Sequence, residues 1–343
     1  MKYKLIIIGF GTVGQGFTQI LIEKKNWLKT EYDLEFEIVG VSTKSKGSIA
    51  NKNGLDPRKL IRLINKKNSL NEFDGGVAGL TTLEMINYLE ANILIEATPT
   101  DLTTGEPAAS FCKAALRKGL HAVTANKGTA TLHYSELKKI ANLKNLTFGI
   151  EGTVMSGTPV LNTVNTNLAG CAINSFRGIL NGTTNYILTE MESGKNYAAV
   201  LEQAQQLGYA ESDPTGDVKG WDAAAKVAIL CKVLFDSEFK LKDVKSQGIT
   251  QITCDDVIQA KKNGYRFKLI GEANFRKGKI SAGVQLEKLP LSDPLAQISG
   301  TTNAITFETD LLGPVTIIGT GAGGKETGFA LLADILVIHR ANV

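Results

Sequence analysis

The chain has 343 residues, a net charge of +4, and 43% hydrophobic and 21% charged residues. This length allows two domains, the composition is that of an ordinary globular protein, and the small charge gives no indication of nucleic-acid binding. The N-terminal apolar run stops at Gly9, too early for a signal peptide, and no segment approaches the roughly 20 apolar residues that a membrane-spanning helix needs.

The four cysteines, at positions 112, 171, 231 and 254, show neither a CxxC pair nor a disulfide spacing. Cys112 and Cys231 fall within predicted helices, where we expect them to be small core residues. Reduced thiols, together with the lack of a targeting or membrane segment, favour a soluble cytoplasmic protein.

Residues 1–150 alternate between apolar strands and helices. The run KLIIIG (4–9) is apolar and ends at a glycine, which is typical of a buried parallel strand. The basic stretch RKLIRLINKK (58–67) has Leu60, Ile61 and Ile64 at helical spacing, which predicts an amphipathic surface helix rather than an anion-binding patch. The alternation predicts an α/β fold with a Rossmann-type, doubly wound parallel sheet. The other segments are a helix at 13–25, a polar gap, a strand at 36–42, segments at 86–91 and 92–101, a helix at 107–118, a strand and turn at 120–128, a helix at 132–142 and a strand at 146–150.

A glycine motif, G-x-G-x-x-G, follows the first predicted strand and opens the first predicted helix. Gly9 would make the tight turn, Gly11 would let the backbone approach a pyrophosphate, and Gly14 would let the helix pack on the strand. The phosphates would then meet the unpaired N–H groups at the start of the helix. We therefore predict a dinucleotide site formed by Gly9, Phe10, Gly11, Thr12, Val13 and Gly14.

The end of the second predicted strand indicates which dinucleotide is bound. NAD sites of this type usually place a carboxylate there to bind the ribose 2′-hydroxyl. Here the strand runs into Ser42, Thr43, Lys44, Ser45 and Lys46, without an acidic residue. Hydroxyls and lysines can bind a 2′-phosphate, which a carboxylate would repel. The loop favours NADP as the cofactor, with NAD as the alternative if the two lysines are ordinary loop residues.

From residue 151 onward, strands follow one another without intervening helices. The stretch 265–289 alternates around a turn at 276–279, as a β-hairpin does. We expect a dinucleotide-binding domain at 1–150, completed by 310–343, and an α+β domain at 151–309 with a mostly antiparallel sheet, for substrate binding and dimerisation. The other elements of this half are a small-residue turn at 152–160, a strand at 172–180, a helix beginning at 182, and helices at 197–207 and 221–235.

A second glycine cluster lies within PVTIIGTGAGGKETGFALLADIL (314–336). Gly319, Gly324 and Lys325 match the spacing of a phosphate loop, but Glu326 stands where that loop needs serine or threonine, so we reject ATP or GTP binding. The cluster is then either a helix-capping turn or a second strand–glycine–helix junction. In the second interpretation the chain returns to the first domain, and Gly321 and Glu326 lie beside the same cofactor.

The stretch SDPTGDVKGWDAAAKVAILCKVLF (212–235) places a lysine in the first turns of a helix that is apolar on nearly every side. Asp222 and Lys226 share a helix face, and such a pair on a surface contributes only about 0.3–0.5 kcal/mol. Here the helix reads as a core helix, and Glu211, Asp213 and Asp217 precede it closely. Desolvation disfavours the charged form of a lysine and neighbouring carboxylates favour it, so a lysine balanced between them could exchange protons with a substrate.

Motifs along essentially the whole chain resemble those of homoserine dehydrogenases. They are GFGTVGQGF (9–17), EATPTD (96–101), TANKG (124–128), EGTVMSGTPV (151–160), GILNGTTNYIL (178–188), GYAESDPTGDVKGWDAAAKVAIL (208–230) and GTGAGGKETGFALLADI (319–335). The resemblance implies reversible, NAD(P)-dependent interconversion of L-homoserine and L-aspartate 4-semialdehyde, in threonine and methionine biosynthesis, by a homodimer. The chain ends after its last predicted helix, so we expect no C-terminal regulatory domain.

The resemblance also implies roles for individual residues. Lys226 and Lys127 would act at the reacting centre, where cations polarise the aldehyde oxygen or ease proton removal from the alcohol, and we expect Lys226 to be the principal acid/base. Glu211 and Asp222 would bind the substrate ammonium, and Asp217 would orient Lys226. The remaining residues are Tyr209, Gly182 and Thr183 around the substrate, and Thr98, Pro99, Asn126 and Lys127 beside the cofactor.

The motif EGTVMSGTP (151–159) resembles the family's loop for a monovalent cation such as sodium. Its ligands here would be Glu151, Val154, Ser156 and Thr158, through carbonyl oxygens. The alternative is an ordinary tight connection to the next helix, because carbonyl ligands leave little signature in side chains.

Two rival functions would also use a dinucleotide fold. A semialdehyde dehydrogenase needs a cysteine that carries an acyl intermediate and a base beside it. The four cysteines lie outside suitable loops, and the only histidines are at 121, 133 and 339. A non-catalytic redox sensor would keep the glycines but would not need Glu211, Asp222 and Lys226 together.

Overall fold

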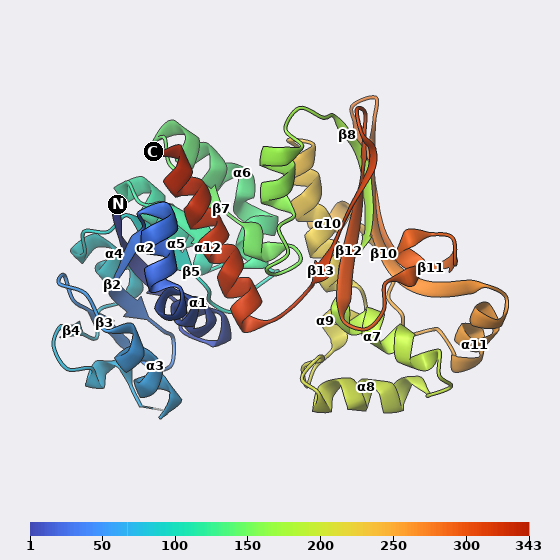
Figure 1. The fold of residues 1–343 in the computed structure, drawn as a ribbon, viewed down its shortest axis with the longest axis horizontal. Coiled ribbons are helices and arrows are strands. Elements are labelled where there is room, and N and C mark those ends of the chain that lie inside the picture. The colour runs from blue at the N-terminus through green and yellow to red at the C-terminus, as the bar shows by residue number, and fades with distance from the viewer. Residues whose placement is uncertain (67, 343) are drawn as a thin grey trace. The chain divides into compact units, whose positions relative to one another are not determined.

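The computed structural model describes residues 1–66 and 68–342, and the chain divides into two compact units (Figure 1). Unit 1 comprises Met1–Gly157 and Gly323–Val343, and unit 2 comprises Thr158–Ala322. The boundaries therefore lie at 157 and 323, rather than at the expected 150 and 310. The second difference arises because β13 (Gly313–Thr320) pairs with β12 (Thr302–Thr309) inside unit 2.

Unit 1 is built on a sheet with the strand order β4-β3-β2-β1-β5-β6-β7. The strands β2, β1, β5, β6 and β7 are parallel, which confirms the Rossmann-type doubly wound fold. The sequence does not predict the antiparallel edge strands β3 and β4, which are too short to show a period. The bounds are β1 Lys2–Ile8, β2 Glu35–Ser42, β3 Ser48–Ala50, β4 Val77–Ala78, β5 Ile93–Glu96, β6 His121–Thr124 and β7 Phe148–Gly149.

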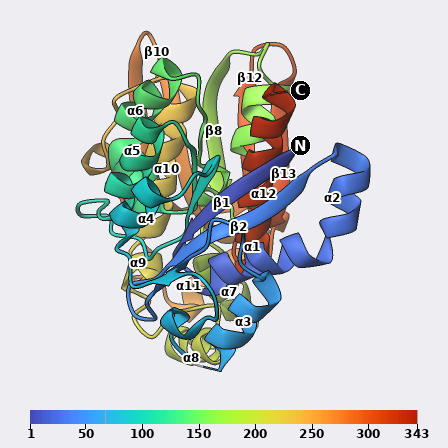
Figure 2. The same ribbon diagram turned by 90° about the vertical axis from the view of Figure 1, so that its left-hand side faces the viewer.

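Helices cover both faces of this sheet. Helix α12 lies beside α1, and Lys325 on α12 forms an ion pair with Glu23 at the end of α1 (2.6 Å; Figure 1). Helices α4, α5 and α6 stack beside one another (Figure 2). The bounds are α1 Thr12–Glu23, α2 Lys25–Tyr32, α3 Pro57–Asn65, α4 Thr82–Tyr88, α5 Ala108–Lys118, α6 Lys127–Leu143 and α12 Gly324–Ala341, with short helices η1 Leu70–Glu72 and η2 Glu151–Thr153.

Two helices of unit 1 show where the sequence pattern is strong and where it is weak. In α3 the residues Leu60 and Ile64 are buried and Asp56 caps the first turn, which confirms the amphipathic surface helix; the predicted last residue, Lys67, lies outside the described residues. The polar stretch before β2 is helix α2 and not a gap. Only Leu28 of α2 is buried, so its sequence carries almost no apolar period.

Unit 2 contains a sheet with the strand order β13-β12-β8-β10-β11-β9. All neighbours are antiparallel except β9 and β11, which confirms the mostly antiparallel sheet. The predicted hairpin is β10–β11, and Lys277 (φ 50°) and Gly278 (φ 74°) form its two-residue turn, whose backbone needs positive φ at both positions. The bounds are β8 Ile173–Ile179, β9 Lys245–Ser246, β10 Tyr265–Arg276 and β11 Lys279–Pro290.

Helices α7, α10 and α11 pack against β10. Helix α10 is buried continuously from Ala223 to Lys232, which confirms that it is a core helix. The sequence does not predict α11, which Thr253 caps by accepting from the N–H of Asp256. The bounds are α7 Gly182–Met191, α8 Tyr197–Gln206, α9 Thr215–Val218, α10 Trp221–Leu234 and α11 Cys254–Lys262, with short helices η3 Thr163–Asn167, η4 Leu241–Asp243 and η5 Pro294–Gln297.

Cys112 on α5 and Cys231 on α10 are fully buried, which confirms them as small core residues. Burial raises the pKa of both thiols, that of Cys231 to about 12. Because the thiolate is the nucleophile, neither position suits the acyl-carrying cysteine of a semialdehyde dehydrogenase. Among the described residues, no helix is long and apolar enough to cross a membrane.

Candidate active site

The glycine turn between β1 and α1 lies at the carboxyl ends of three strands. The N–H of Gly9 donates to the carbonyl oxygen of Ser42 at the end of β2 (2.8 Å), and the N–H of Ala97, after β5, donates to that of Ile8 at the end of β1 (2.7 Å). Gly9 has φ +88°, and a Cβ atom there would lie 2.3 Å from the carbonyl oxygen of Ala97. A Cβ atom on Gly14 would lie 2.3 Å from the carbonyl oxygen of Gly9. Only glycine fits both positions, and the turn sits at the edge where open α/β sheets bind ligands.

Glu96, the last residue of β5, is fully buried at this edge. Its carboxylate accepts hydrogen bonds from the N–H of Thr98 (2.7 Å), from the hydroxyl of Thr98 and from the hydroxyl of Thr124 (2.5 Å). Burial raises the pKa of this carboxyl above its ordinary value. Thr124 in turn accepts from the N–H of Asn126 (2.9 Å). Glu96 thus joins the ends of β5 and β6, which carry several of the predicted cofactor residues.

Asn126 connects the same two loops and begins helix α6. Its side-chain NH₂ donates to the carbonyl oxygens of Thr98 (3.2 Å) and Pro99 (3.1 Å), and its Oδ1 accepts from the N–H of Thr129 (3.2 Å). Lys127, the first residue of α6, follows directly and is half-buried. The structure therefore gathers at this edge the predicted residues Gly9, Phe10, Gly11, Thr12, Val13, Gly14, Ser42, Thr98, Pro99, Asn126 and Lys127.

The loop after β2 leaves few groups for a 2′-phosphate. The hydroxyl of Ser42 is buried against that of Thr82 (2.9 Å), and the ammonium of Lys46 donates to the carbonyl oxygen of Ile64 on α3 (3.1 Å). Lys44 is exposed. The hydroxyl of Thr43 is also engaged, because it donates to the carbonyl oxygen of Gly47 (3.1 Å) and accepts from the N–H of Lys46 (2.8 Å). Lys44 and Ser45 are the exposed residues at the tip of this loop.

In unit 2 the residue before α7, Asn181, contacts two of the three predicted acids. The side-chain NH₂ of Asn181 donates to Oδ1 of Asp217 on α9 (2.7 Å) and to Oδ2 of Asp222 on α10 (2.9 Å). Lys226, one turn further along α10, forms an ion pair with the same Asp222 oxygen (2.9 Å) and donates to the carbonyl oxygen of Leu180 (2.6 Å). Because Lys226 is only 6% exposed, this is not the routine solvated pair that an i, i+4 spacing usually gives.

The remaining predicted substrate residues lie on or beside α7. The hydroxyl of Thr183 donates to the carbonyl oxygen of Tyr209 (2.6 Å), and the ring of Tyr209 meets that of Tyr186 edge-on at 5.0 Å. Gly182 is the first residue of α7, and Glu211 lies on the exposed loop two residues after Tyr209. The structure thus connects Gly182, Thr183, Tyr209, Asp217, Asp222 and Lys226, and leaves the carboxylate of Glu211 in solvent.

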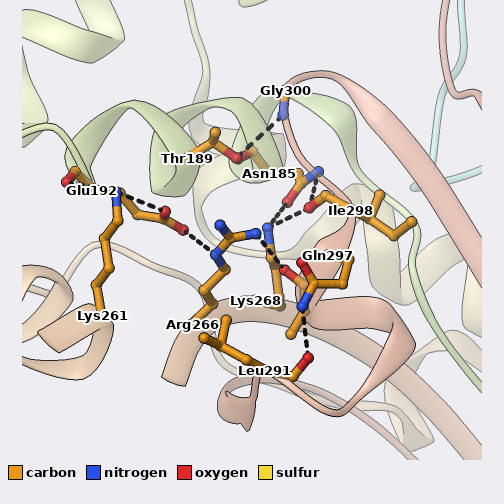
Figure 3. A network of polar contacts seen from close by, with 11 residues as sticks. Asn185, Thr189, Glu192, Lys261, Arg266, Lys268, Leu291, Gln297, Ile298 and Gly300 are labelled. Atoms are coloured by element: carbon orange, nitrogen blue, oxygen red, sulfur yellow. Dashed lines mark hydrogen bonds and ion pairs between the residues drawn. The ribbon is translucent and has the colours of Figure 1, made fainter. Parts of the chain in front are cut away.

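A second buried lysine, Lys268 on β10, ties the loop after η5 to α7 (Figure 3). Its ammonium donates to Oδ1 of Asn185 on α7 (2.9 Å) and to the carbonyl oxygen of Ile298, and Asn185 also donates to the carbonyl oxygen of Thr302 (3.0 Å). Burial lowers the pKa of Lys268 to about 8, although the charge of Glu192 acts in the opposite direction. Lys268 therefore supports the helix whose first residues are Gly182 and Thr183.

The lowered pKa of Lys268 predicts a specific pH dependence of stability. Between about pH 8 and 10.5 the unfolded chain holds this proton and the folded chain does not, so wild-type stability should rise with pH relative to Lys268→Met. The gain over this window should approach about 3 kcal/mol, since one pKa unit corresponds to about 1.4 kcal/mol. Urea unfolding of both proteins at pH 7.5, 9 and 10.5 measures it, and parallel stability curves would contradict it.

The predicted cation loop is anchored to α12 within unit 1. The N–H of Glu151 donates to Oδ2 of Asp334 (3.0 Å), and the hydroxyls of Ser156 and Thr327 share a hydrogen bond (2.7 Å). Met155 and Ser156 are consecutive residues with left-handed backbone (φ 55° and 54°). Among the described residues, no group of three or more histidine, cysteine, aspartate or glutamate side chains could hold a metal.

The remaining predicted residues of the cation loop and of the glycine cluster after β13 belong partly to unit 1 and partly to unit 2. Val154 is buried in unit 1, whereas Thr158 is the first residue of unit 2, where its hydroxyl donates to the carbonyl oxygen of Thr320 (3.0 Å). Gly321 follows β13 in unit 2, and Glu326 is exposed on the first turn of α12 in unit 1. The glycine cluster therefore joins β13 in unit 2 to α12 in unit 1, and Gly323 is the N-cap residue of α12. That Gly321 and Glu326 lie beside the cofactor stays a prediction.

Both parts of the chain match family models. Residues 159–336 match the model described as homoserine dehydrogenase, and residues 9–151 match the model described as homoserine dehydrogenase, NAD binding domain. The chain belongs to the homoserine dehydrogenase family. It is accordingly an NAD(P)-dependent oxidoreductase that acts on the CH–OH group of homoserine.

Individual homoserine dehydrogenases match over nearly the full length of the chain. The NAD(+)-dependent homoserine dehydrogenase of Pseudomonas canavaninivorans is 45% identical over 99% of this chain and 97% of its own. The homoserine dehydrogenase of Methanocaldococcus jannaschii is 38% identical over 98% of this chain and 99% of its own. A hyperthermophilic archaeal homoserine dehydrogenase mutant, solved in complex with NADPH, superposes with a TM-score of 0.85 at 28% identity, covering 100% of this chain and 99% of its own.

The sequence did not single out three buried polar residues that organise these sites. Glu96 and Asn181 lie within the motifs EATPTD and GILNGTTNYIL, but the sequence predicted no separate role for either residue. Lys268 was only a polar residue in an alternating strand. Their partners lie far along the chain, 28 residues away for Glu96 with Thr124 and 83 for Lys268 with Asn185. A charged residue within an otherwise apolar strand was the one available signal, and it applies to Glu96, the last residue of the strand ILIE.

Proposed function

We propose that Lys226 is the principal acid/base in homoserine oxidation by this chain, with Lys127 as a second cationic group in the same reaction. The observation that carries the proposal is the buried contact of the Lys226 ammonium with Asp222 (2.9 Å) and with the carbonyl oxygen of Leu180 (2.6 Å). An ammonium has three N–H donors, so these two acceptors leave one for a substrate oxygen.

The reaction takes a hydride from the CH–OH carbon and a proton from the hydroxyl, and the aldehyde remains. The nicotinamide, when bound, accepts the hydride. In the oxidation the neutral amine of Lys226 would accept the hydroxyl proton and become the ammonium, and in the reverse direction this ammonium would polarise the aldehyde oxygen and return the proton. Low exposure of Lys226 strengthens this effect, because water does not screen the interaction.

The acids beside Lys226 suit the substrate's ammonium group. We infer that Asp222 and Glu211 bind it, and that Asp217 keeps Lys226 oriented through the shared Asn181. Tyr209, Gly182 and Thr183 would surround the rest of homoserine, and the hydrogen bond from Thr183 to Tyr209 supports this by joining the two segments (2.6 Å).

The assay that tests this function follows the absorbance of the reduced nicotinamide. Purified protein should reduce NADP⁺ or NAD⁺ with L-homoserine and not with L-serine or L-threonine. L-aspartate 4-semialdehyde with the reduced cofactor should give the reverse reaction, which serves as the control if equilibrium favours homoserine. Failure in both directions would overturn the proposal.

We also propose NADP as the preferred cofactor, with the 2′-phosphate bound by Lys44 and the hydroxyl of Ser45. The exposed positions of Lys44 and Ser45 support this, whereas Ser42, Thr43 and Lys46 are already engaged. The relative named NAD(+)-dependent, at 45% identity, represents the alternative.

The change Lys44→Ala should lower kcat/KM for NADP⁺ about tenfold and leave that for NAD⁺ within about twofold, because only the former carries the phosphate. Initial rates with both cofactors, at saturating homoserine, measure the ratio. If the ratio of kcat/KM for NADP⁺ to that for NAD⁺ equals the wild-type value, Lys44 does not contribute to the cofactor preference.

Two further features complete the proposal. A monovalent cation such as sodium would be held by carbonyl oxygens of Val154 and Ser156 with Glu151 and Thr158; the left-handed backbone at Met155 and Ser156 supports such a turn. Replacing sodium with a large organic cation at constant ionic strength should then lower the melting temperature.

A cytoplasmic homodimer is proposed from the family, and a monomer on gel filtration would contradict the dimer.

A further inference from the structure

Asn181 contacts two of the predicted acids of unit 2, Asp217 and Asp222. It is 4% exposed, and its side-chain NH₂ donates one hydrogen to Asp217 (2.7 Å) and the other to Asp222 (2.9 Å). The Asp222 oxygen that it binds is the same oxygen that pairs with Lys226. Asn181 therefore stands between a carboxylate on α9 and the carboxylate–lysine pair on α10.

The other end of the same amide caps helix α7. Its Oδ1 accepts from the N–H of Thr184 (2.9 Å) and from the hydroxyl of Thr184 (2.9 Å). A primary amide offers two donors and two acceptor lone pairs. Both donors and the acceptor position facing the N–H of Thr184 are used, and the Thr184 hydroxyl shares its one hydrogen between Oδ1 and the Asn181 carbonyl oxygen (3.1 Å). The orientation of the amide is fixed, because its reversal would turn an oxygen toward two carboxylates and an NH₂ toward a backbone donor.

We propose that Asn181 is a positioning residue that holds Asp217 and Asp222 at a set separation and so fixes Lys226 for the reaction. This inference rests on the proposed function of these three residues. The side chain at position 181 must be uncharged for this role, since two carboxylates that share one neutral group with two N–H donors can both stay ionised. Asparagine is also among the few residues that cap a helix well, and it does so here while it binds both acids.

Alternative side chains would each lose part of this arrangement. Aspartate at 181 would still cap α7 but would add a third carboxylate against Asp217 and Asp222. Serine would keep a capping hydroxyl but is too short to replace the two N–H donors. The two variants therefore separate the charge effect from the loss of the hydrogen bonds.

The test compares Asn181→Asp and Asn181→Ser with a matched control. Asn196 caps α8 in the same way, by accepting from the N–H of Ala199 (2.8 Å), and lies on the exposed surface. With homoserine, kcat/KM should fall about 100-fold in Asn181→Asp and about tenfold in Asn181→Ser, and stay within about twofold in Asn196→Asp. The Kd for the dinucleotide should not change, since the predicted cofactor residues other than Gly321 lie in unit 1.

The pH profile distinguishes positioning from loss of helix stability. In Asn181→Asp the acid limb of kcat/KM should move upward by about one pH unit, because like charges raise the pKa of at least one carboxyl. Asn181→Ser and Asn196→Asp should keep the wild-type limb. An unshifted limb in Asn181→Asp, or equal losses in Asn181→Asp and Asn196→Asp, would overturn the inference.

A measurement without turnover separates this inference from the proposed function. The stability deficit of Asn181→Asp in urea should shrink between pH 7 and pH 4.5, as protonation relieves the repulsion among three carboxyls, whereas that of Asn196→Asp should stay constant. If wild type fails to oxidise homoserine but this difference appears, the proposed function is wrong and the contact of Asn181 with both acids stands. If the two deficits run in parallel, the inference is wrong whatever the activity.

Discussion

Replacing Lys226 with methionine is expected to lower kcat/KM for homoserine oxidation by about 1,000-fold or more, while the Kd for the dinucleotide changes by less than about threefold. Methionine keeps most of the volume but removes the group that would bind the substrate oxygen. It also leaves Asp222 without its ionic partner and the Leu180 carbonyl without its donor. Steady-state rates, together with the quenching of protein fluorescence by the reduced cofactor, measure the two quantities separately.

Lys232 provides the matched control for this change. It lies on the same helix, α10, is 6% exposed, and has a pKa that burial lowers. Lys232→Met should leave kcat/KM within about threefold, because Lys232 lies nearly two turns beyond Lys226. Comparable losses in both variants would show that burial of a lysine on α10, and not its chemistry, explains the effect, and full activity in Lys226→Met would refute the mechanism.

Local sequence patterns predict those features of the fold and the site that are determined by residues close to one another in the sequence. The turn Gly9–Gly14 needs only its own strand and helix, and the pair Asp222–Lys226 needs only the helical repeat. Helix α10 is apolar on nearly every side, which predicts burial whatever surrounds it. For these elements the sequence and the structure agree.

Contacts between distant segments were not predictable in the same way. The acceptor of Lys226 is Leu180, 46 residues earlier, and Asn181 meets Asp222 across 41 residues. A sequence shows neither that α7, α9 and α10 meet nor that one amide joins them. The predicted end of the second domain, residue 309, differs from the observed end, Ala322, for a related reason. The sequence of β13 is compatible with either sheet, and only its pairing with β12 assigns it to unit 2.

Glu96→Ala is expected to cause the largest loss of stability in unit 1, about 4 kcal/mol, and to weaken dinucleotide binding. The change removes the acceptor for the buried hydroxyl of Thr124 and for the N–H and hydroxyl of the half-buried Thr98. An unpaired buried donor costs about 1–3 kcal/mol, and a half-buried one costs less. A small cavity adds to the loss. Urea unfolding and the Kd for the dinucleotide measure both effects.

Glu96→Gln separates the role of shape from that of charge at this position. Glutamine keeps one oxygen acceptor but turns an NH₂ toward one of the two threonines, so it should cost about 1 kcal/mol, much less than alanine. Because burial raises the pKa of Glu96, the folded chain keeps this proton to higher pH than the unfolded chain does. Wild-type stability relative to Glu96→Gln should therefore fall as pH rises above the ordinary range of a glutamate. The alanine variant could prove as stable as the glutamine variant and bind the dinucleotide with wild-type affinity. Glu96 would then only fill space at the end of β5 and would not organise the loops that follow it.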